Sequence, residues 1–220
     1  MFEVLSEYQT EIWVSIGETF IMVGFSILAA LLIGLPVGTF LFLCRKGQLI
    51  ENQVVFSSLN LIVNIIRSFP FLLLVIFLIP FTRLIIGTAI GTAAATVPMC
   101  IIAIAHYSRL VEQSLLDVPK GVMEAAVSMG ASVKDIIFKF LYVEARSSLV
   151  LSMTTSTISF ISYSTIMGVV GGGGIGDFAI RYGYQQFRSD LMIYIIIIMV
   201  VFVQLVQYAG ITFARKIDKR

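Results

Sequence analysis

Long uncharged stretches alternate with short polar connections along this chain. Uncharged residues fill 19–44, 84–105, 147–176 and 191–214. Each stretch has at least the ~20 residues that a helix needs to cross the hydrocarbon of a bilayer. A further apolar stretch is interrupted by Arg67 but is apolar on both sides of it. The pattern predicts five membrane-spanning helices, at about 19–44, 54–80, 84–107, 147–170 and 191–214.

The composition agrees with a protein that is solvated mainly by lipid. Of the 220 residues, 58% are hydrophobic and only 13% are charged, whereas soluble domains carry about 25% charged residues. A core cannot enclose this much apolar surface. We therefore predict an all-α membrane protein that forms a single transmembrane domain over 1–220. The net charge of +2 gives no indication of nucleic-acid binding.

Basic residues are distributed unevenly over the connections between the predicted spans. One alternate set of connections carries eleven, namely Arg45, Lys46, Arg109, Lys120, Lys134, Lys139, Arg146, Arg215, Lys216, Lys219 and Arg220. The other set carries three, Arg83, Arg181 and Arg188, together with an acidic N-terminus. Cytoplasmic connections carry the excess of Lys and Arg. We expect the N-terminus outside, and the C-terminus and the polar stretch 108–146 in the cytosol.

The stretch 108–146 contains small residues where a solvated loop normally carries charge. Pro119 and Gly121 predict a break, followed by a short helix from Val122 to about Gly130. Its candidate docking residues are Glu124, Ala125, Ala126, Met129, Gly130 and Ala131, with Val122 and Met123 as further apolar contacts. Small side chains let another backbone approach closely. The segment is predicted to dock a soluble partner; the alternative is an amphipathic helix that has no partner.

The sequence provides little for catalysis or cofactor binding. It has no G-x-x-x-x-G-K-[ST] loop, and the run from Gly171 to Gly176 fits G-x-G-x-x-G only formally, because it follows a predicted membrane helix instead of a strand. His106 is the chain's one histidine and is expected to be structural. We expect no metal and no cofactor in this chain, and no enzyme activity of its own.

Two features are candidates for lining a polar pathway. In the fourth span, Ser152, Thr155, Ser159 and Ser162 fall on one helical stripe, and Met167 follows near its end. Such a stripe lines a pathway or packs against another helix. Arg67 is an intramembrane charge, which is usually functional. Its alternatives are snorkelling toward the cytosol and bracing of the polar stretch.

Several motifs together resemble one transporter family. They are Arg67-Ser68-Phe69-Pro70-Phe71, Ile79-Pro80-Phe81-Thr82-Arg83, Glu124-Ala125-Ala126 followed by Met129-Gly130-Ala131, Met167-Gly168, and Arg181-Tyr182-Gly183-Tyr184. The chain is similar to the permease subunits of bacterial ABC importers, most of all those for methionine, from about Gly34 to its end. The family's Leu-Pro block is replaced here by Phe140-Leu141-Tyr142-Val143, so the second half of the loop is expected to run on as helix.

The resemblance implies an ABC importer type I permease fold in the bacterial inner membrane. It implies a homodimer of this chain, two ATPase subunits that hold ATP and Mg, and an external substrate-binding protein or lipoprotein. The segment 108–146 would be the coupling loop. The cargo would be methionine or a similar small amino acid; the alternatives are another amino acid such as cystine and, less well supported, an ATP-independent secondary transporter.

Overall fold

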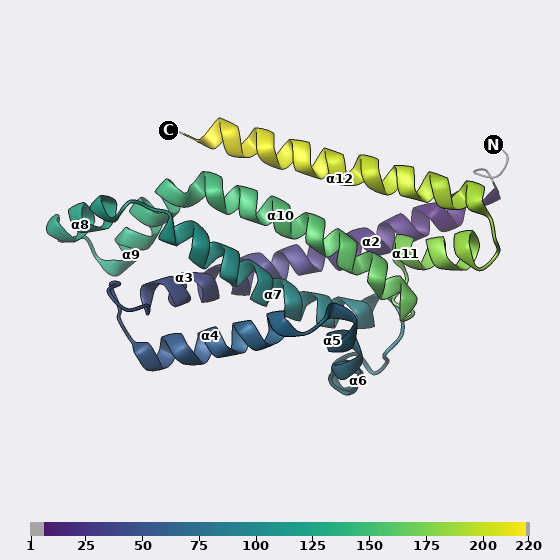
Figure 1. Ribbon diagram of the computed structural model, residues 1–220, viewed down its shortest axis with the longest axis horizontal. Coiled ribbons are helices and arrows are strands. Elements are labelled where there is room, and N and C mark those ends of the chain that lie inside the picture. Colours follow the sequence, from purple (N-terminus) through teal and green to yellow (C-terminus); the bar gives the residue numbers. More distant parts are fainter. Residues whose placement is uncertain (1–6, 219–220) are drawn as a thin grey trace.

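The computed structural model describes residues 7–218, and every regular element in that range is helical (Figure 1). The elements are α2 (Gln9–Ala29), η1 (Ala30–Gly34), α3 (Leu35–Leu43), α4 (Gln53–Ser68), α5 (Phe71–Phe77), α6 (Ile79–Ile86), α7 (Thr92–Leu116), α8 (Lys120–Ser128), α9 (Val133–Asp135), η2 (Ile136–Leu141), α10 (Tyr142–Val169), α11 (Gly174–Phe178), η3 (Ala179–Tyr184) and α12 (Ser189–Ile217), where η marks π-helical turns. The predicted all-α fold is confirmed.

Three uninterrupted helices are long and apolar enough to cross a membrane: Gln9–Leu43, Thr92–Leu116 and Ser189–Ile217. Two further pairs qualify only together, because Gln53–Ser68 meets Phe71–Phe77 at 105° and Val133–Val169 meets Gly174–Tyr184 at 44°. The described chain therefore has three such helices, or up to five if each bent pair is one span. The first helix begins at Gln9, about three turns before the predicted residue 19, because the mixed polar and apolar stretch from Gln9 to Glu18 is also helical.

The predicted second span, 54–80, is not one straight helix. Phe69 is extended, with φ −71° and ψ 133°, and Pro70 caps the start of α5. A residue that precedes proline is pushed out of the α region, and proline has no N–H to continue the helix. Arg67 therefore lies in the last turn of α4, just before the bend. A cation there complements the helix dipole.

Helix α7 is the centre of the bundle, packed by α2, α3, α4 and α10. It begins at Thr92, later than the predicted residue 84, because α6 and a turn with Gly87 and Gly91 at positive φ occupy the preceding stretch. A Cβ on Gly38 would lie 2.4 Å from the Ser108 carbonyl oxygen. The Ser108 hydroxyl also donates to the Gly34 carbonyl at 3.0 Å. Small residues thus bring α3 and α7 into backbone contact.

The ends of the bundle are consistent with an odd number of crossings. The beginning of α2 and the end of α12 lie at opposite ends in Figure 1. Helices α8 and α9 lie at the same end as the end of α12. The basic residues Lys219 and Arg220, which the charge count includes, lie outside the described residues. This arrangement places the candidate docking segment and the C-terminal end of α12 on one side.

Candidate functional site

The candidate docking segment forms α8, at the left-hand end of the bundle in Figure 1. Pro119 is extended and caps the helix, which begins at Lys120 and not at Val122. Gly121 lies inside the first turn, so Pro119 alone makes the predicted break. The helix ends where Gly130 adopts φ +73° and its N–H bonds the Val127 carbonyl at 2.9 Å. Glycine adopts this left-handed conformation without the steric cost of a side chain.

The side chains of α8 divide into an inner and an outer face. Ala126 is 0% exposed within its own chain, and Val122 and Met123 pack against the same core. Glu124, Ala125 and Met129 are exposed, Met129 by 66%. Ala126, Val122 and Met123 thus hold the helix to the bundle, and Ala126, which has no exposed surface in this structure, does not lie on the outer face as predicted. The outer face keeps the candidates Glu124, Ala125, Met129 and Gly130, while Ala131 is half-buried beneath it.

A capped turn connects α8 to the next helix. The Asp135 N–H donates to the Ser132 hydroxyl oxygen at 3.2 Å, and that hydroxyl donates to Asp135 Oδ2 at 2.6 Å. Lys139 Nζ lies 2.6 Å from Asp135 Oδ1. The hydrogen bond from Lys139, and then that from Ser132, lower the pKa of Asp135 from its ordinary value. Helix continues from Val133 to Val169, as the replaced Leu-Pro block predicts.

The predicted serine and threonine stripe on α10 is divided by the packing. Ser152 lies 3.1 Å from the Ser114 hydroxyl of α7, and Ser148 donates to the same hydroxyl at 2.9 Å. Ser152 therefore contacts a neighbouring helix. Thr155 and Ser162 are exposed and Ser159 is half-buried, and each donates to the carbonyl four residues earlier. Met167 is buried in the core, so its predicted exposure to a pathway is not found in this conformation.

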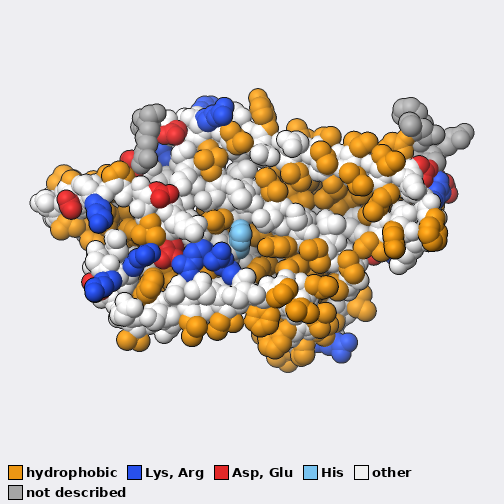
Figure 2. Space-filling view, viewed as in Figure 1, with side chains coloured by type: hydrophobic (Ala, Val, Ile, Leu, Met, Phe, Trp, Pro, Cys, Tyr) orange, Lys and Arg blue, Asp and Glu red, His pale blue; other side chains and the backbone are white. Residues whose placement is uncertain are grey.

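Arg67 is exposed and forms no hydrogen bond or ion pair within the described residues 7–218. Arg109, Tyr163 and Glu112 are within electrostatic range of it. Figure 2 shows the chain's one histidine, in pale blue, beside a group of basic side chains on this face. The Nε2 atom of His106 is enclosed and has no hydrogen-bond partner among the described residues. The structure thus gathers Arg67 and His106 at one polar patch between α4, α7 and α10.

An ion-pair network that the sequence reasoning missed lies next to this patch. Arg109 Nη1 contacts Glu112 Oε2 at 2.5 Å, and Arg109 Nη2 contacts Asn60 Oδ1 at 2.5 Å and Asn64 Oδ1 at 2.7 Å. Glu112 is 1% exposed, and Arg45 lies 3.6 Å from it. The signal was present in the sequence, because Asn60 and Asn64 are four residues apart and Arg109 and Glu112 three apart, which places each pair on one helix face.

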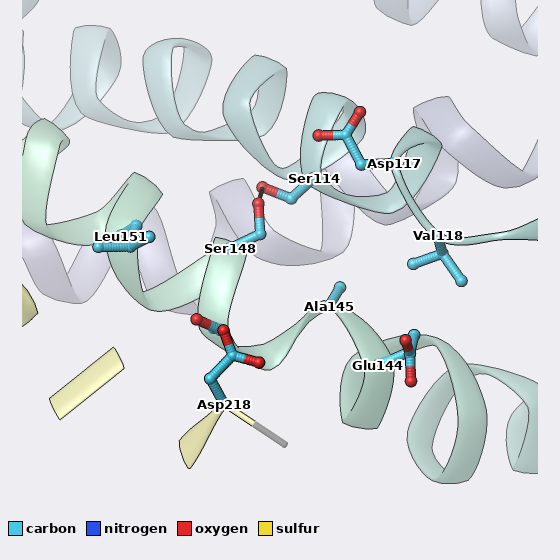
Figure 3. Close-up of a pocket in the computed structure, with 9 residues that line it drawn as sticks. Ser114, Asp117, Val118, Glu144, Ala145, Ser148, Leu151 and Asp218 are labelled. Carbon is cyan, nitrogen blue, oxygen red and sulfur yellow. Dashed lines mark hydrogen bonds between the residues drawn. The ribbon is translucent and has the colours of Figure 1, made fainter. Parts of the chain in front are cut away.

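A pocket of about 230 Å³ lies between the ends of α7, α10 and α12, close to where the chain enters α8 (Figure 3). The residues around it are Ser114, Asp117, Val118, Glu144, Ala145, Ser147, Ser148, Leu151 and Asp218. Within residues 7–218, no group of three or more His, Cys, Asp or Glu side chains could hold a metal ion.

The glycine run forms a turn whose N–H groups are already bonded. Gly173 and Gly174 have φ +76° and +80°. Glu18 Oε2 of α2 accepts from the Gly174 N–H at 2.6 Å, and Thr19 Oγ1 accepts from the Ile175 N–H at 2.9 Å. The Glu18 carboxylate and the Thr19 hydroxyl thus already accept from two N–H groups of this turn. The formal G-x-G-x-x-G match is structural.

Solved structures similar to this chain share its fold. A structure described as inward-facing conformations of the MetNI methionine ABC transporter matches with a TM-score of 0.94 and 38% identity, covering 97% of this chain and 99% of that one. A structure described as an amino acid ABC transporter with histidines matches with a TM-score of 0.78 and covers 98% of each chain. The latter is 18% identical and supports the fold alone.

Proteins with similar sequences are also named as methionine transport permeases. The probable D-methionine transport system permease protein MetI of Vibrio cholerae is 42% identical over 203 residues, 92% of this chain and 90% of that protein. The methionine import system permease protein MetP of Bacillus subtilis is 40% identical over 211 residues, 96% of this chain and 95% of that protein. A family model matches residues 31–220. The chain therefore belongs to the family described as binding-protein-dependent transport system inner membrane component.

Proposed function

We propose that this ABC transporter permease imports methionine, or a closely related small neutral amino acid, across the cytoplasmic membrane. The observation that carries the proposal is the near-complete coverage by relatives named for methionine transport, at 42% and 40% identity. The likeness to the MetNI methionine transporter, with a TM-score of 0.94, supports the same cargo. The motifs Arg67-Ser68-Phe69-Pro70-Phe71 and Arg181-Tyr182-Gly183-Tyr184 support it from the sequence.

The proposed partners are two separate ATPase subunits, which would hold ATP and Mg, a second copy of this chain, and an external substrate-binding protein. The contact with an ATPase is proposed for the outer face of α8, where Glu124, Ala125 and Met129 are exposed. An exposed methionine and small neighbours suit insertion into a groove on a partner. Two identical α8 helices in a two-fold dimer would match two identical ATPases.

Movement of α8 would displace two spans, α7 and α10, at the same time. Before α8 the chain continues directly from α7 through Asp117, and after α8 the helix from Val133 to Val169 runs into α10 without interruption. Closure of the ATPases on ATP would displace both α8 helices. Because Ala126 is packed in the core, α8 would carry the ends of α7 and α10 with it. This is the proposed route from ATP binding to a change of access.

The proposed pathway runs along the face that carries Arg67, Thr155, Ser159 and Ser162. Arg67 is an unpaired cation among the described residues, and Thr155 and Ser162 are exposed on α10. We propose that the N-terminus lies outside and the C-terminus in the cytosol. The charge bias and the common end of α8 and α12 in Figure 1 support this orientation.

The proposal is tested by uptake of labelled methionine in a strain that lacks its own importer. The permease is expressed with its ATPase and binding protein, and excess unlabelled cystine serves as competitor. We expect excess unlabelled methionine to abolish uptake of the label and excess cystine to leave it unchanged. If no methionine enters, or if cystine competes equally, the cargo is wrong.

Coupling is tested in the same strain with Ala125→Trp on the outer face of α8. The expected result is loss of uptake or of the assembled complex, with the permease still present in the membrane. Lys46→Trp is the matched control, since Lys46 is an exposed residue of a different connection. Normal uptake and assembly with Ala125→Trp would show that this face does not dock the ATPase.

A further inference from the structure

We propose that this permease binds an anionic phospholipid of the inner leaflet in a groove between α3, α10 and α12, with the Arg146 guanidinium holding the phosphate. The groove has a volume of about 440 Å³. Its lining residues are Leu31, Leu35, Tyr107, Tyr142, Arg146, Leu149, Val150, Met153, Thr154, Thr157, Val206 and Phe213. We call this the Arg146 groove. The inference rests on the proposed orientation, with α8 in the cytosol.

The part of the groove beyond Arg146 matches one leaflet in length. The lining on α10 begins at Tyr142, and from Arg146 to Thr157 it extends about 16 Å along a helix at 1.5 Å per residue. Half of the ~30 Å hydrocarbon core is about 15 Å. Arg146 lies one turn from the start of α10 at Tyr142, on the side of α8. The groove therefore extends from the cytosolic interface to about the middle of the bilayer, the depth of one acyl chain.

The polar side chains that line the groove are already hydrogen-bonded, with one exception. The Tyr107 hydroxyl donates to the Leu149 carbonyl, and the Tyr142 hydroxyl lies 2.7 Å from Thr39 Oγ1. Thr154 and Thr157 donate to carbonyls four residues earlier. Arg146 alone forms no hydrogen bond or ion pair within the part of the chain that the structure describes. Its five N–H donors are available to an anion, and guanidinium groups bind phosphate bidentately.

The charges around the groove favour an anionic ligand. No acidic side chain lines it. Glu144 and Asp218 line the separate cavity of Figure 3, together with Ser147. Lys216 is exposed and lies three residues after Phe213, so it shares a helix face with a lining residue. Basic pockets between membrane helices on the cytoplasmic side are a known type of site for anionic headgroups.

An amino-acid cargo fits this groove poorly, because a zwitterion needs an anionic or carbonyl partner for its ammonium group. A phospholipid meets both requirements of the site, one cation at the interface and a long apolar wall below it. The wall is formed by side chains such as Leu31, Val150 and Phe213, with Phe213 56% exposed. Burial of acyl CH₂ groups against such a wall is favourable relative to a poorly packed, open groove.

The test measures bound lipid directly and does not depend on transport. The assembled transporter is purified in detergent, titrated with phosphatidylglycerol or phosphatidylcholine, and weighed by native mass spectrometry. Wild type is expected to retain phosphatidylglycerol and to release phosphatidylcholine. Arg146→Gln should weaken phosphatidylglycerol binding about fivefold, the effect of ~1 kcal/mol per basic residue at a membrane surface. Lys139→Gln is the matched control, because Lys139 is exposed and paired with Asp135.

A second variant separates the groove from general surface charge. Val150→Trp would fill the groove with a side chain while leaving Arg146 in place, and it should also displace phosphatidylglycerol. Loss of lipid with both variants but not with Lys139→Gln supports the site. Retention of lipid by Val150→Trp, equal binding of the two lipids, or a changed number of permease copies in place of lost lipid overturns it. Because methionine uptake is measured separately, a wrong cargo leaves this result intact.

Discussion

Gly210 of α12 faces Thr154 of α10 so closely that a Cβ on Gly210 would lie 2.1 Å from Thr154 Oγ1. This approach is the tightest that any described glycine makes to a side chain. It joins the last span to the fourth and closes one side of the Arg146 groove, whose lining includes Thr154 and nearby Phe213. The position of α12 therefore depends on a residue without a side chain.

Replacement of Gly210 by leucine should destabilise the protein by about 1–3 kcal/mol, because added atoms in a packed contact force neighbouring helices apart. The measurement is the thermal unfolding midpoint in detergent. Gly24→Ala in α2 is the matched control, since a Cβ there meets nothing within 4 Å. Equal midpoints for Gly210→Leu and wild type would mean that α12 adjusts freely.

Glu18→Ala should loosen the turn that begins α11. The variant removes the acceptor of the Gly174 N–H, whose bond to Glu18 Oε2 is 2.6 Å long. An unsatisfied part-buried donor costs about 1–3 kcal/mol. Faster amide hydrogen exchange at residues 173–176 is the readout, and Glu11→Ala, which changes an exposed carboxylate of the same helix, should leave it unchanged. Glu18→Gln keeps an acceptor oxygen and should fall between the two.

Arg109→Leu should be strongly destabilising, by about 3–5 kcal/mol, because it leaves the buried Glu112 carboxylate with only Arg45 at 3.6 Å. The double variant Arg109→Leu with Glu112→Leu should recover much of the loss, since it removes both charges. Unfolding midpoints of the two single variants and the double variant measure the coupling. Additive losses would show that the pair contributes nothing beyond its separate side chains.

Arg67→Leu should insert into the membrane at least as well as wild type, because an intramembrane arginine costs about 2.5–3.5 kcal/mol on insertion scales. It should lower methionine uptake several-fold if the charge serves the pathway. Arg67→Lys keeps the charge and should transport better than Arg67→Leu. Amounts of membrane-inserted permease and initial uptake rates are compared. Normal uptake by Arg67→Leu would make this arginine a structural residue.

The all-helical membrane class could be predicted from the sequence because hydrocarbon restricts the backbone to few structures. Apolar runs of about 20 residues must be helical, since every backbone N–H and C=O in hydrocarbon needs an internal partner. Helix α8 and its end at Gly130 could also be predicted from the sequence, because proline and glycine act on the local backbone. The start at Lys120 differed by two residues from the predicted Val122 for the same local reason, the position of Pro119.

Tertiary packing decided the features that depend on which side of a helix faces a neighbour. The small side chains of Ala125 and Ala126 made both of them docking candidates in the sequence, but the core buries Ala126 and leaves Ala125 exposed. Packing likewise separates two residues of the predicted stripe on α10. Ser152 bonds Ser114 of α7, whereas Thr155 is exposed. In lipid both faces of a helix are apolar, so the pattern that separates inside from outside in a soluble helix is weak.

The amino-acid sequence by itself thus determined an all-helical membrane protein, a short helix in its longest polar stretch, and the family. Local chemistry is sufficient for these, because each depends on a run of neighbouring residues. The bend at Pro70, the joining of Arg109 to Asn60 and Glu112, and the capping of Gly174 by Glu18 were decided only by the tertiary structure. The last of these partners are 156 residues apart. Contacts between such distant residues arise from how the helices pack against one another.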